Sequence, residues 1–447
     1  MSEHALSGWG GYPRAETRVV APRDEEGMRA ALRGGGAVAR GAGRAYGDAG
    51  IGRAVTVSTR GLDRLVAFDD ATGRLVAEAG VTLGEVIEAF LPRGWFPMVT
   101  PGTKFVTLGG MAAADVHGKN HHRDGGFAGT VDWMDVMGAD GEVRRCSREE
   151  EPELFHWTLG GMGLTGVILR LAIRLRRVET AWIRQTAIPA PSLDAALDAV
   201  EAAEGATYSV AWIDCLARGA ALGRSILLLG EHAELTDLPP RERWRPFDAR
   251  RPRPLSLPVH LPGWLLAPPV MRAFNEAYWQ AGKRRAGTRL VDWDRYFYPL
   301  DAIGDWNRAY GRRGFVQFQT VLPPDRAREG LRALLGATSE AGQGSFLAVL
   351  KRMGAETGPE GGGMSFGMPG MTLALDMALR DGTLALMDRL HGVAVEHGGR
   401  FYLAKDARLS AETLRRADAR VDDFRRWREA RGLRQAFRSA QSDRLDL

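Results

Sequence analysis

His117 has the sequence surroundings that most favour chemistry. It ends the run TLGGMAAADVHG (107–118), and Lys119 follows after one glycine. Small residues are needed where a flat ring system lies against backbone, and a histidine can give or take a proton near neutral pH. A lone histidine is more often structural, but the flanking glycines and Lys119 favour a functional site here.

A metal site is not expected around this histidine. His121 and His122 lie close by in the sequence, but the spacing of the three histidines fits no usual structural zinc pattern and no cysteine is near them. Cys146 and Cys215 are far apart and belong to no CxxC pair, so we expect reduced thiols buried in the core.

Two further glycine-rich segments are candidates for contact with a cofactor. The segment ARGAGRAYGD (39–48) can place consecutive backbone amides around a pyrophosphate, and the alternative is a plain surface turn. The segment GGMGLTG (160–166) contains GxGxxG, but it follows a helical segment and opens a strand. Because a dinucleotide fingerprint must follow a strand and open a helix, we reject a Rossmann motif and expect only a lining role.

These segments need a folded scaffold, and the chain is long enough to provide one. Its 447 residues predict two to three domains. The net charge is +5 with acids and bases interleaved, so nucleic-acid binding is not expected. The exception is the basic run 241–253, which suits an anionic lipid or a phosphorylated substrate. No signal peptide or membrane-spanning stretch is expected.

The hydrophobic pattern places the segments on a mixed α+β scaffold. The following elements are predicted: helices at 25–34, 82–93 and 150–158, strands at 36–40, 52–60 and 167–178, and a hairpin over 131–145. Beyond Ala181, helical segments alternate with strands, which indicates one broad antiparallel sheet covered by helices. The Pro- and Arg-rich stretch 233–270 is expected to be a loop or lid, and 410–441 to be helical.

In this order, the three glycine-rich segments resemble the PCMH-type FAD-binding domain of the vanillyl-alcohol-oxidase superfamily. Further segments resemble the decaprenylphosphoryl-β-D-ribose oxidase family within it, over nearly the whole chain: WNRAYG (306–311), GFVQFQ (314–319), SFLAVLK (345–351) and GGRFYLAKD (398–406). The resemblance implies a two-domain flavoprotein, with an FAD-binding domain at 1–180, a substrate domain at 181–398, and a C-terminal segment, 399–447, that returns to the FAD-binding domain.

The resemblance also implies which residues hold FAD. Arg44 and Tyr46 stand where relatives with covalent flavin often carry a histidine, so non-covalent FAD is expected. The residues assigned to the cofactor are Ala39, Arg40, Gly41, Ala42, Gly43, Arg44, Ala45, Tyr46, Gly47, Asp48, Ala49, Gly102, Thr107, Leu108, Gly109, Gly110, Ala114, Asp115, Val116, His117, Ile168 and Tyr402.

The resemblance assigns the reacting and substrate-binding side chains as well. Lys405 is the first candidate for the base or alkoxide-stabilising cation and His117 the second; the alternative for Lys405 is a surface ion pair with Asp406. Residues assigned to the substrate are Tyr46, Lys119, Gln317, Gln319, Lys351, Thr372 and Lys405. Lys119 and Lys351 suit a phosphate. The two glutamines share one side of a strand and suit sugar hydroxyls, or form the solvated face of an edge strand.

Three pocket positions depart from the pattern that the resemblance implies: Thr372 stands for an amide that touches the ligand, Ala374 for a cysteine and Phe297 for a tyrosine. The family commonly has Trp-Asn-Ile-Cys at 371–374, where this chain has Met-Thr-Leu-Ala, and a pocket tyrosine is replaced by Phe297. The cysteine that suicide inhibitors of the family attack is thus absent, with Ala374 in its place. Hydride chemistry needs none of these residues, whereas the preference for sugar and lipid can change.

The resemblance implies oxidation of the 2′-hydroxyl of a ribose carried on a polyprenyl phosphate. An NAD(P)H-dependent short-chain reductase would then return the keto sugar as arabinose. The expected place is the cytoplasmic surface of the inner membrane, bound peripherally, with the periplasmic side of the cell envelope as the alternative. Two other functions stay open: an alditol or sugar-lactone oxidase on the same fold, and a non-catalytic flavin-binding protein.

Overall fold

The computed structural model describes residues 3–248, 255–355 and 363–447. A four-stranded sheet opens the fold, in the order β1 (Glu3–Ser7), β2 (Arg14–Val20), β4 (Val55–Ser58) and β3 (Ala37–Arg40). Helix α1 (Glu25–Leu32) packs on it and begins at Asp24, whose carboxylate accepts the Gly27 N–H at 2.8 Å. The predicted helix and the strand pair β3–β4 are confirmed, and the first glycine-rich segment connects these two strands.

A six-stranded sheet follows. Its order is β5 (Leu65–Asp69), β6 (Arg74–Glu78), β10 (Val167–Arg177), β8 (Val131–Met137) and β9 (Val143–Ser147), and β7 (Trp95–Pro97) also pairs with β10. The predicted hairpin is β8–β9. Helix α2 (Leu83–Phe90) starts with a capping box between Thr82 and Glu85, and α3 (Leu108–Ala113) starts at Thr107.

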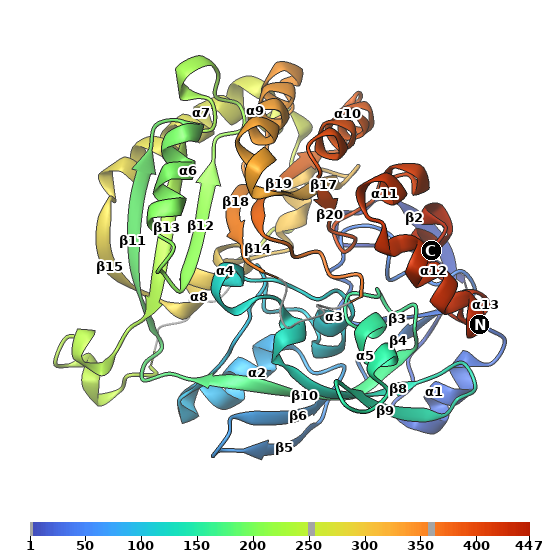
Figure 1. Ribbon diagram of the computed structural model, residues 1–447. Coiled ribbons are helices and arrows are strands. Elements are labelled where there is room, and N and C mark those ends of the chain that lie inside the picture. The colour runs from blue at the N-terminus through green and yellow to red at the C-terminus, as the bar shows by residue number, and fades with distance from the viewer. Residues whose placement is uncertain (1–2, 249–254, 356–362) are drawn as a thin grey trace.

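The broad antiparallel sheet expected beyond Ala181 is confirmed, with eight strands. Their order is β15 (Gly287–Asp292), β11 (Trp182–Ala190), β13 (Ser225–His232), β12 (Tyr208–Ile213), β18 (Ala348–Met353), β19 (Gly370–Ala378), β17 (Phe315–Leu322) and β20 (Arg400–Phe401). In Figure 1 this sheet, green to orange, stands above the two smaller sheets, blue to teal.

The two faces of the large sheet have different partners. Helices α6 (Leu193–Ala202), α9 (Pro324–Ala341) and α10 (Thr383–Glu396) pack on one face through a core that includes Leu197, Leu331 and Leu390. On the opposite face, α7 (Pro268–Arg284) covers β11, β13 and β12, where Trp279 packs on Trp212 and Ile226. The strands β18, β19 and β17 turn that face toward the half of the chain that contains the three glycine-rich segments, and Gln319 on β17 contacts His117 there.

The C-terminal segment is helical, as predicted, but consists of four short helices: α11 (Ala411–Ala417), α12 (Arg420–Ala430), α13 (Leu433–Ala436) and α14 (Ala440–Leu445). They lie beside the first sheet in Figure 1, where Phe437 bridges to Ala37 and Ser439 to Gly52.

The stretch 233–270 is largely irregular, as expected. Its described part has three short 3-10 turns, η4 (Leu235–Asp237), η5 (Glu242–Trp244) and η6 (Gly263–Leu266), and the two-residue strand β14 (Leu255–Ser256). Part of the predicted basic run lies outside the described residues. Both cysteines are buried and free, in agreement with the prediction.

Candidate active site

The three glycine-rich segments, which are far apart in the sequence, meet in the structure. Gly160 N–H donates to the Ala112 carbonyl at 3.1 Å, and Met162 N–H donates to the Ala113 carbonyl at 2.8 Å. The first segment packs against the second so closely that a Cβ at Gly41 would lie 2.0 Å from Thr107 Oγ1. Glycine is required at this contact because any side chain would clash.

As predicted, the GxGxxG sequence at 161–166 does not form a Rossmann turn. It follows α5 (Pro152–Thr158) and opens β10. Gly160 and Gly163 have φ values of +76° and +77°, which favour glycine, and the segment curves back over α3 rather than starting a helix.

Two arginines of the first glycine-rich loop have different roles: Arg40 fixes the loop, and Arg44 has a donor without a partner in the described part of the chain. The Arg40 guanidinium closes the loop by donating to the carbonyls of Ser7 at 2.8 Å and Gly50 at 3.2 Å. Arg44 stacks on Trp9 with its guanidinium carbon 3.9 Å from the ring centre. Its buried Nε has no hydrogen-bond partner among the described residues. Because a buried donor without a partner costs free energy, this atom indicates that a polar ligand belongs here.

Glycines of the second segment also leave room for a ligand. A Cβ at Gly102 would meet no atom within 4 Å, and one at Gly110 would meet only Thr107 Oγ1, at 3.0 Å. Asp115 has a φ of 36° and its carboxylate accepts the Ala128 N–H at 2.7 Å, which fixes the turn that leads to His117. Open backbone, together with the unpartnered Nε–H of Arg44 in the described part of the chain, fits a flat cofactor with a diphosphate.

The polar face of the large sheet carries the residues assigned to a substrate. Cross-strand pairs join Gln317 to Asp376, Gln319 to Ala374 and Val321 to Thr372 between β17 and β19. Lys351 on β18 pairs with Thr372 on β19. Both glutamines are buried, and β17 lies between β19 and β20. The alternative that they form the solvated face of an edge strand is therefore wrong.

His117 bridges the two halves of the molecule. Its Nε2 lies 3.0 Å from Gln319 Nε2, and Gln319 Nε2 also lies 3.4 Å from Thr372 Oγ1. The imidazole packs against Tyr402, with ring centres 4.9 Å apart. Burial, with the positive charge of Lys351, holds the pKa of His117 well below its usual value. The ring is therefore neutral, and its Nδ1 has no hydrogen-bond partner in the described part of the chain.

Lys405 lies on the other side of this site. Its Nζ is 3.4 Å from the centre of the Tyr46 ring, and Tyr46 N–H donates to the Ala404 carbonyl at 2.9 Å. Burial lowers the pKa of Lys405, and the carboxyl group of Asp376 opposes that change. The alternative of an ion pair with Asp406 is wrong, because the Asp406 carboxylate accepts a 2.9 Å hydrogen bond from Arg444 instead.

Lys119 and Lys351 complete a set of three half-buried amines. Burial lowers the pKa of Lys351 to about 8. Burial, followed by the charge of Lys351, lowers that of Lys119 to about 7. Lys119 donates to the Tyr296 carbonyl and lies 4.3 Å from the centre of the Tyr296 ring. The charge of Lys351 also lowers the pKa of Lys405, so the amines repel one another, and an anionic ligand between them would relieve that repulsion.

The neighbouring histidines use their ring nitrogens on the backbone. His121 Nδ1 accepts the Gly354 N–H at 3.1 Å, and His122 Nε2 lies 2.8 Å from the Ala206 carbonyl oxygen. Within residues 3–248, 255–355 and 363–447, no group of three or more His, Cys, Asp or Glu side chains is arranged to hold a metal ion.

The sequence reasoning missed Asp376 and Arg444. Asp376 lies in an apolar strand two positions beyond Ala374 and four beyond Thr372, so its side chain points to the same face of the sheet. That alternation was available in the sequence. Arg444 gave no such signal. Its partners Asp48 and Asp406 lie 396 and 38 positions away in the sequence, and only the fold brings the three side chains together.

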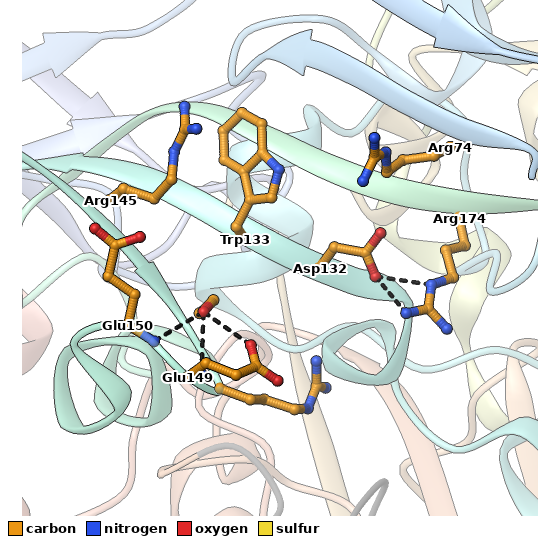
Figure 2. Close-up of a pocket in the computed structure, with 9 residues that line it drawn as sticks. Arg74, Asp132, Trp133, Arg145, Glu149, Glu150 and Arg174 are labelled. Atoms are coloured by element: carbon orange, nitrogen blue, oxygen red, sulfur yellow. Dashed lines mark hydrogen bonds and ion pairs between the residues drawn. The ribbon is translucent and has the colours of Figure 1, made fainter.

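A hollow of about 380 Å³ lies away from these residues, on the six-stranded sheet at β6, β8, β9 and β10 (Figure 2). Its charges largely satisfy one another. Arg174 pairs with Asp132 at 2.7 Å, and Arg145 stacks on Trp133 with its guanidinium carbon 3.8 Å from the ring centre. Exposed arginines paired with acids do not create a reactive group, so this hollow is not a candidate for the reaction.

Comparisons with known proteins agree with this geometry. Residues 17–147 match the family described as FAD binding domain. The decaprenylphosphoryl-β-D-ribose oxidase of Mycolicibacterium smegmatis is 35% identical over 99% of this chain and 97% of its own. An uncharacterised protein of Streptomyces coelicolor is 35% identical over 82% of this chain and 100% of its own. Cytokinin dehydrogenase 5 of Arabidopsis thaliana is 34% identical over 22% of this chain and 19% of its own.

Proposed function

We propose, from the premise that this chain belongs to the decaprenylphosphoryl-β-D-ribose oxidase family, that it oxidises the 2′-hydroxyl of a polyprenylphosphoryl-β-D-ribose to the 2′-keto sugar. The chain is an FAD-dependent oxidoreductase with an FAD-binding domain. The observation that carries the substrate proposal is the set of half-buried amines around His117: Lys351 on β18 and Lys405 after β20, which both act on its pKa, and Lys119, two positions after it in the sequence.

The residues present fit FAD. The loop 39–49, with the free Arg44 Nε donor within the described residues, is proposed to hold the diphosphate. Gly102, the segment 107–117 and Tyr402 would hold the ring system, and Ile168 would line it. FAD, when bound, supplies the acceptor for the hydride that leaves the sugar carbon. Because Arg44 and Tyr46 occupy the loop, we expect FAD without a covalent bond.

Lys405 is proposed to take the proton of the reacting hydroxyl. Its lowered pKa gives a share of neutral amine near neutral pH, which an ordinary lysine lacks. Tyr46 restrains the amine from one side, and the backbone of Lys405 is fixed by its N–H bond to the Tyr402 carbonyl at 3.0 Å. Neutral His117, bonded to Gln319, is the second candidate and is proposed to orient the hydroxyl.

The remaining polar side chains are proposed to recognise the sugar phosphate. Lys351 and Lys119 would bind the phosphate, and Gln317, Gln319 and Thr372 the sugar hydroxyls. Of the departures, only Thr372 belongs to this set, where a hydroxyl replaces an amide. Ala374 adds only a methyl group to the face, and Phe297 is buried in the core, with its ring centre 4.9 Å from that of Tyr208. They are proposed to alter the preference for sugar and lipid rather than the chemistry.

An exposed apolar strip is proposed to receive the lipid and a membrane surface. We define it as Leu255, Val259, Trp264, Phe274 and Ile303, whose exposed fractions range from 44% to 81%. Leu266, in the same turn as Trp264, packs on the buried cluster of Tyr46, Trp306, Tyr310 and Phe315. The strip thus continues inward to the ring that contacts Lys405. Exposed apolar patches on soluble surfaces commonly mark such contacts.

The membrane proposal concerns peripheral binding. In the described ranges, no helix combines the length and the apolar character needed to cross a bilayer. We propose attachment to the cytoplasmic surface of the inner membrane, with the periplasmic side as the alternative, and delivery of the keto sugar to an NAD(P)H-dependent short-chain reductase. The product would enter the synthesis of arabinan for the cell wall.

The test is reduction of the bound flavin by candidate donors without oxygen, which is monitored by the visible absorbance of the flavin. Polyprenylphosphoryl ribose is expected to bleach the protein, and the lipid phosphate without ribose is the matched control. Bleaching by free alditols or sugar lactones, with none by the lipid-linked ribose, would establish the alternative oxidase. A protein that no donor reduces would be a flavin-binding protein without this activity.

A further inference from the structure

Gln319 on β17 holds the ring of His117 with its side-chain amide. Gln319 Nε2 lies 3.0 Å from His117 Nε2 and donates to Thr372 Oγ1 at 3.4 Å. An amide nitrogen carries two hydrogens and accepts none, so it can bond to the imidazole only where the ring nitrogen is a bare acceptor. Both hydrogens of the Gln319 amide therefore have a partner, and His117 Nε2 carries no hydrogen.

The imidazole of His117 is neutral, so one of its two ring nitrogens carries a hydrogen. Burial, followed by the charges of Lys351, His121 and Lys405, holds the pKa of His117 well below its usual value. Because Nε2 accepts from Gln319, the hydrogen of the neutral ring lies on Nδ1. One amide thus selects one tautomer of the histidine.

The other contacts of the ring are apolar. The imidazole packs against Phe366 and Tyr402, with ring centres 5.2 Å and 4.9 Å away. His117 itself is 8% exposed, and among the described residues its Nδ1 has no hydrogen-bond partner. A buried N–H without a partner costs free energy, which indicates that an oxygen acceptor belongs beside it in the ligand-bound protein.

We infer that Gln319 is a positioning residue that fixes His117 in the tautomer with its hydrogen on Nδ1, and that His117 acts on a ligand only as a hydrogen-bond donor. The inference deepens the proposed function and rests on it for the identity of the ligand. The lone pair of Nε2 is engaged by Gln319, and Nδ1 already carries a hydrogen. Neither nitrogen can take the proton of the reacting hydroxyl, so Lys405 remains as the base.

The first experiment reads the tautomer in the FAD-bound protein, by NMR of histidine with isotopically labelled ring nitrogens. A nitrogen that carries hydrogen resonates far upfield of a bare one, and the signals lost in His117→Phe belong to His117. In the wild type, Nδ1 is expected to carry the hydrogen. In Gln319→Glu, the lysines nearby keep the new carboxylate charged, so it accepts a hydrogen bond and Nε2 is expected to carry a hydrogen.

The matched control is Gln317→Met, two positions earlier on the same face of β17. Gln317 Nε2 donates to Asp376 Oδ1 instead of to the histidine, so the tautomer is expected to stay as in the wild type. A wild-type ring with its hydrogen on Nε2 would overturn the inference, because the amide oxygen would then face the ring. An unchanged tautomer in Gln319→Glu would overturn the positioning role. If that variant does not fold, Gln319→Met replaces it and is expected to show both tautomers; a single, unchanged one would have the same meaning.

The second experiment measures flavin reduction by polyprenylphosphoryl ribose. His117→Asn places an amide N–H near the position of Nδ1 but has no basic nitrogen, whereas His117→Phe has neither group. The Asn variant is expected to stay within about tenfold of the wild-type rate, with a larger loss in the Phe variant.

Loss of a base would instead cost about a hundredfold or more in both variants. Equal losses of that size would overturn the donor role of His117. If the wild type is not reduced by this donor, the proposed function fails, while the NMR series still decides which tautomer Gln319 selects.

Discussion

The Lys405 amine lies 3.4 Å from the centre of the Tyr46 ring, although 359 positions separate the two residues in the sequence (405 − 46). Tyr46 belongs to the first glycine-rich loop and Lys405 to the loop after β20. The contact therefore joins the loop proposed to hold the cofactor to the side chain proposed to take the proton.

Lys405→Met should remove flavin reduction without removing flavin. Loss of a positioned base lowers the rate about a hundredfold to ten-thousandfold. Stopped-flow reduction by polyprenylphosphoryl ribose measures the rate, and the absorbance ratio of flavin to protein measures FAD content. Lys283→Met, on the outer helix α7, is the matched control and should reduce normally. A variant that keeps the wild-type rate would remove Lys405 from the mechanism.

The ring of Tyr46, rather than its hydroxyl, should matter for Lys405. Tyr46→Phe keeps the face that attracts the amine and the edge contact with Phe315, whose ring centre is 5.2 Å away. Tyr46→Leu loses a desolvated cation–π contact of about 2 kcal/mol, which corresponds to a rate loss of about thirtyfold. The same stopped-flow assay distinguishes the two variants. Equal losses in both would point to the hydroxyl instead.

Arg444 should hold the cofactor loop and the Lys405 loop together. Its guanidinium donates to Asp48 at 2.6 Å and to Asp406 at 2.9 Å, and both carboxylates are buried. Arg444→Met leaves both uncompensated and should cost about 3–5 kcal/mol of stability, with faster release of FAD.

The control for this variant is Arg438→Met, because Arg438 forms a more exposed pair with Asp443, at 2.9 Å. It should cost no more than about 1 kcal/mol. Thermal unfolding and the recovery of flavin fluorescence on release measure both variants. Similar losses in the two proteins would show that the buried pair has no special part in holding the loops.

Binding of a phosphorylated donor should weaken above pH 8. The pKa of Lys351 is about 8, so the amine is charged below that pH and loses its charge as pH rises through it. An anionic substrate is attracted only by the charged form, so kcat/KM should fall on the alkaline side. Lys351→Arg stays charged and should remove the part of the fall that is centred near pH 8, leaving the part that Lys119 causes near pH 7. An unphosphorylated sugar donor, as a control, should show no such limb.

The apolar strip should govern binding to lipid rather than chemistry. Val259→Ser with Trp264→Ser removes two of its most exposed side chains, at 63% and 65%, and should reduce co-flotation with vesicles of anionic lipid. Reduction by a soluble, short-chain donor should stay unchanged. Val66→Ser, 52% exposed on β5 of another sheet, is the matched control. Undiminished flotation would show that membranes are bound elsewhere.

Much of the fold was accessible from local patterns. The capping box at Thr82, the turn at Gly141 and the alternation in β17 each depend on neighbours within a few residues, which is why those elements were predicted correctly. The rejection of the Rossmann motif also followed from local order, since it needed only the identity of the elements on either side of residues 160–166.

The partners of the reactive side chains were not accessible in the same way. Sequence reasoning offered Asp406 as the partner of Lys405 because the two residues are adjacent. In the fold, Asp406 accepts a hydrogen bond from Arg444, and the carboxyl group that raises the pKa of Lys405 is that of Asp376. It also allowed an edge strand for Gln317 and Gln319, since the pairing of β20 beyond β17 depends on a chain segment about 80 residues later.

By itself, the sequence determined the types of groups available: glycines that permit close backbone contact, three lysines and a histidine with small neighbours, and strands whose alternate residues share a face. The tertiary structure alone decided which of these groups are buried and which charges face one another. That division has a physical cause, because backbone conformation depends on nearby residues, while the pKa of a side chain depends on lost hydration and on charges supplied by distant parts of the chain.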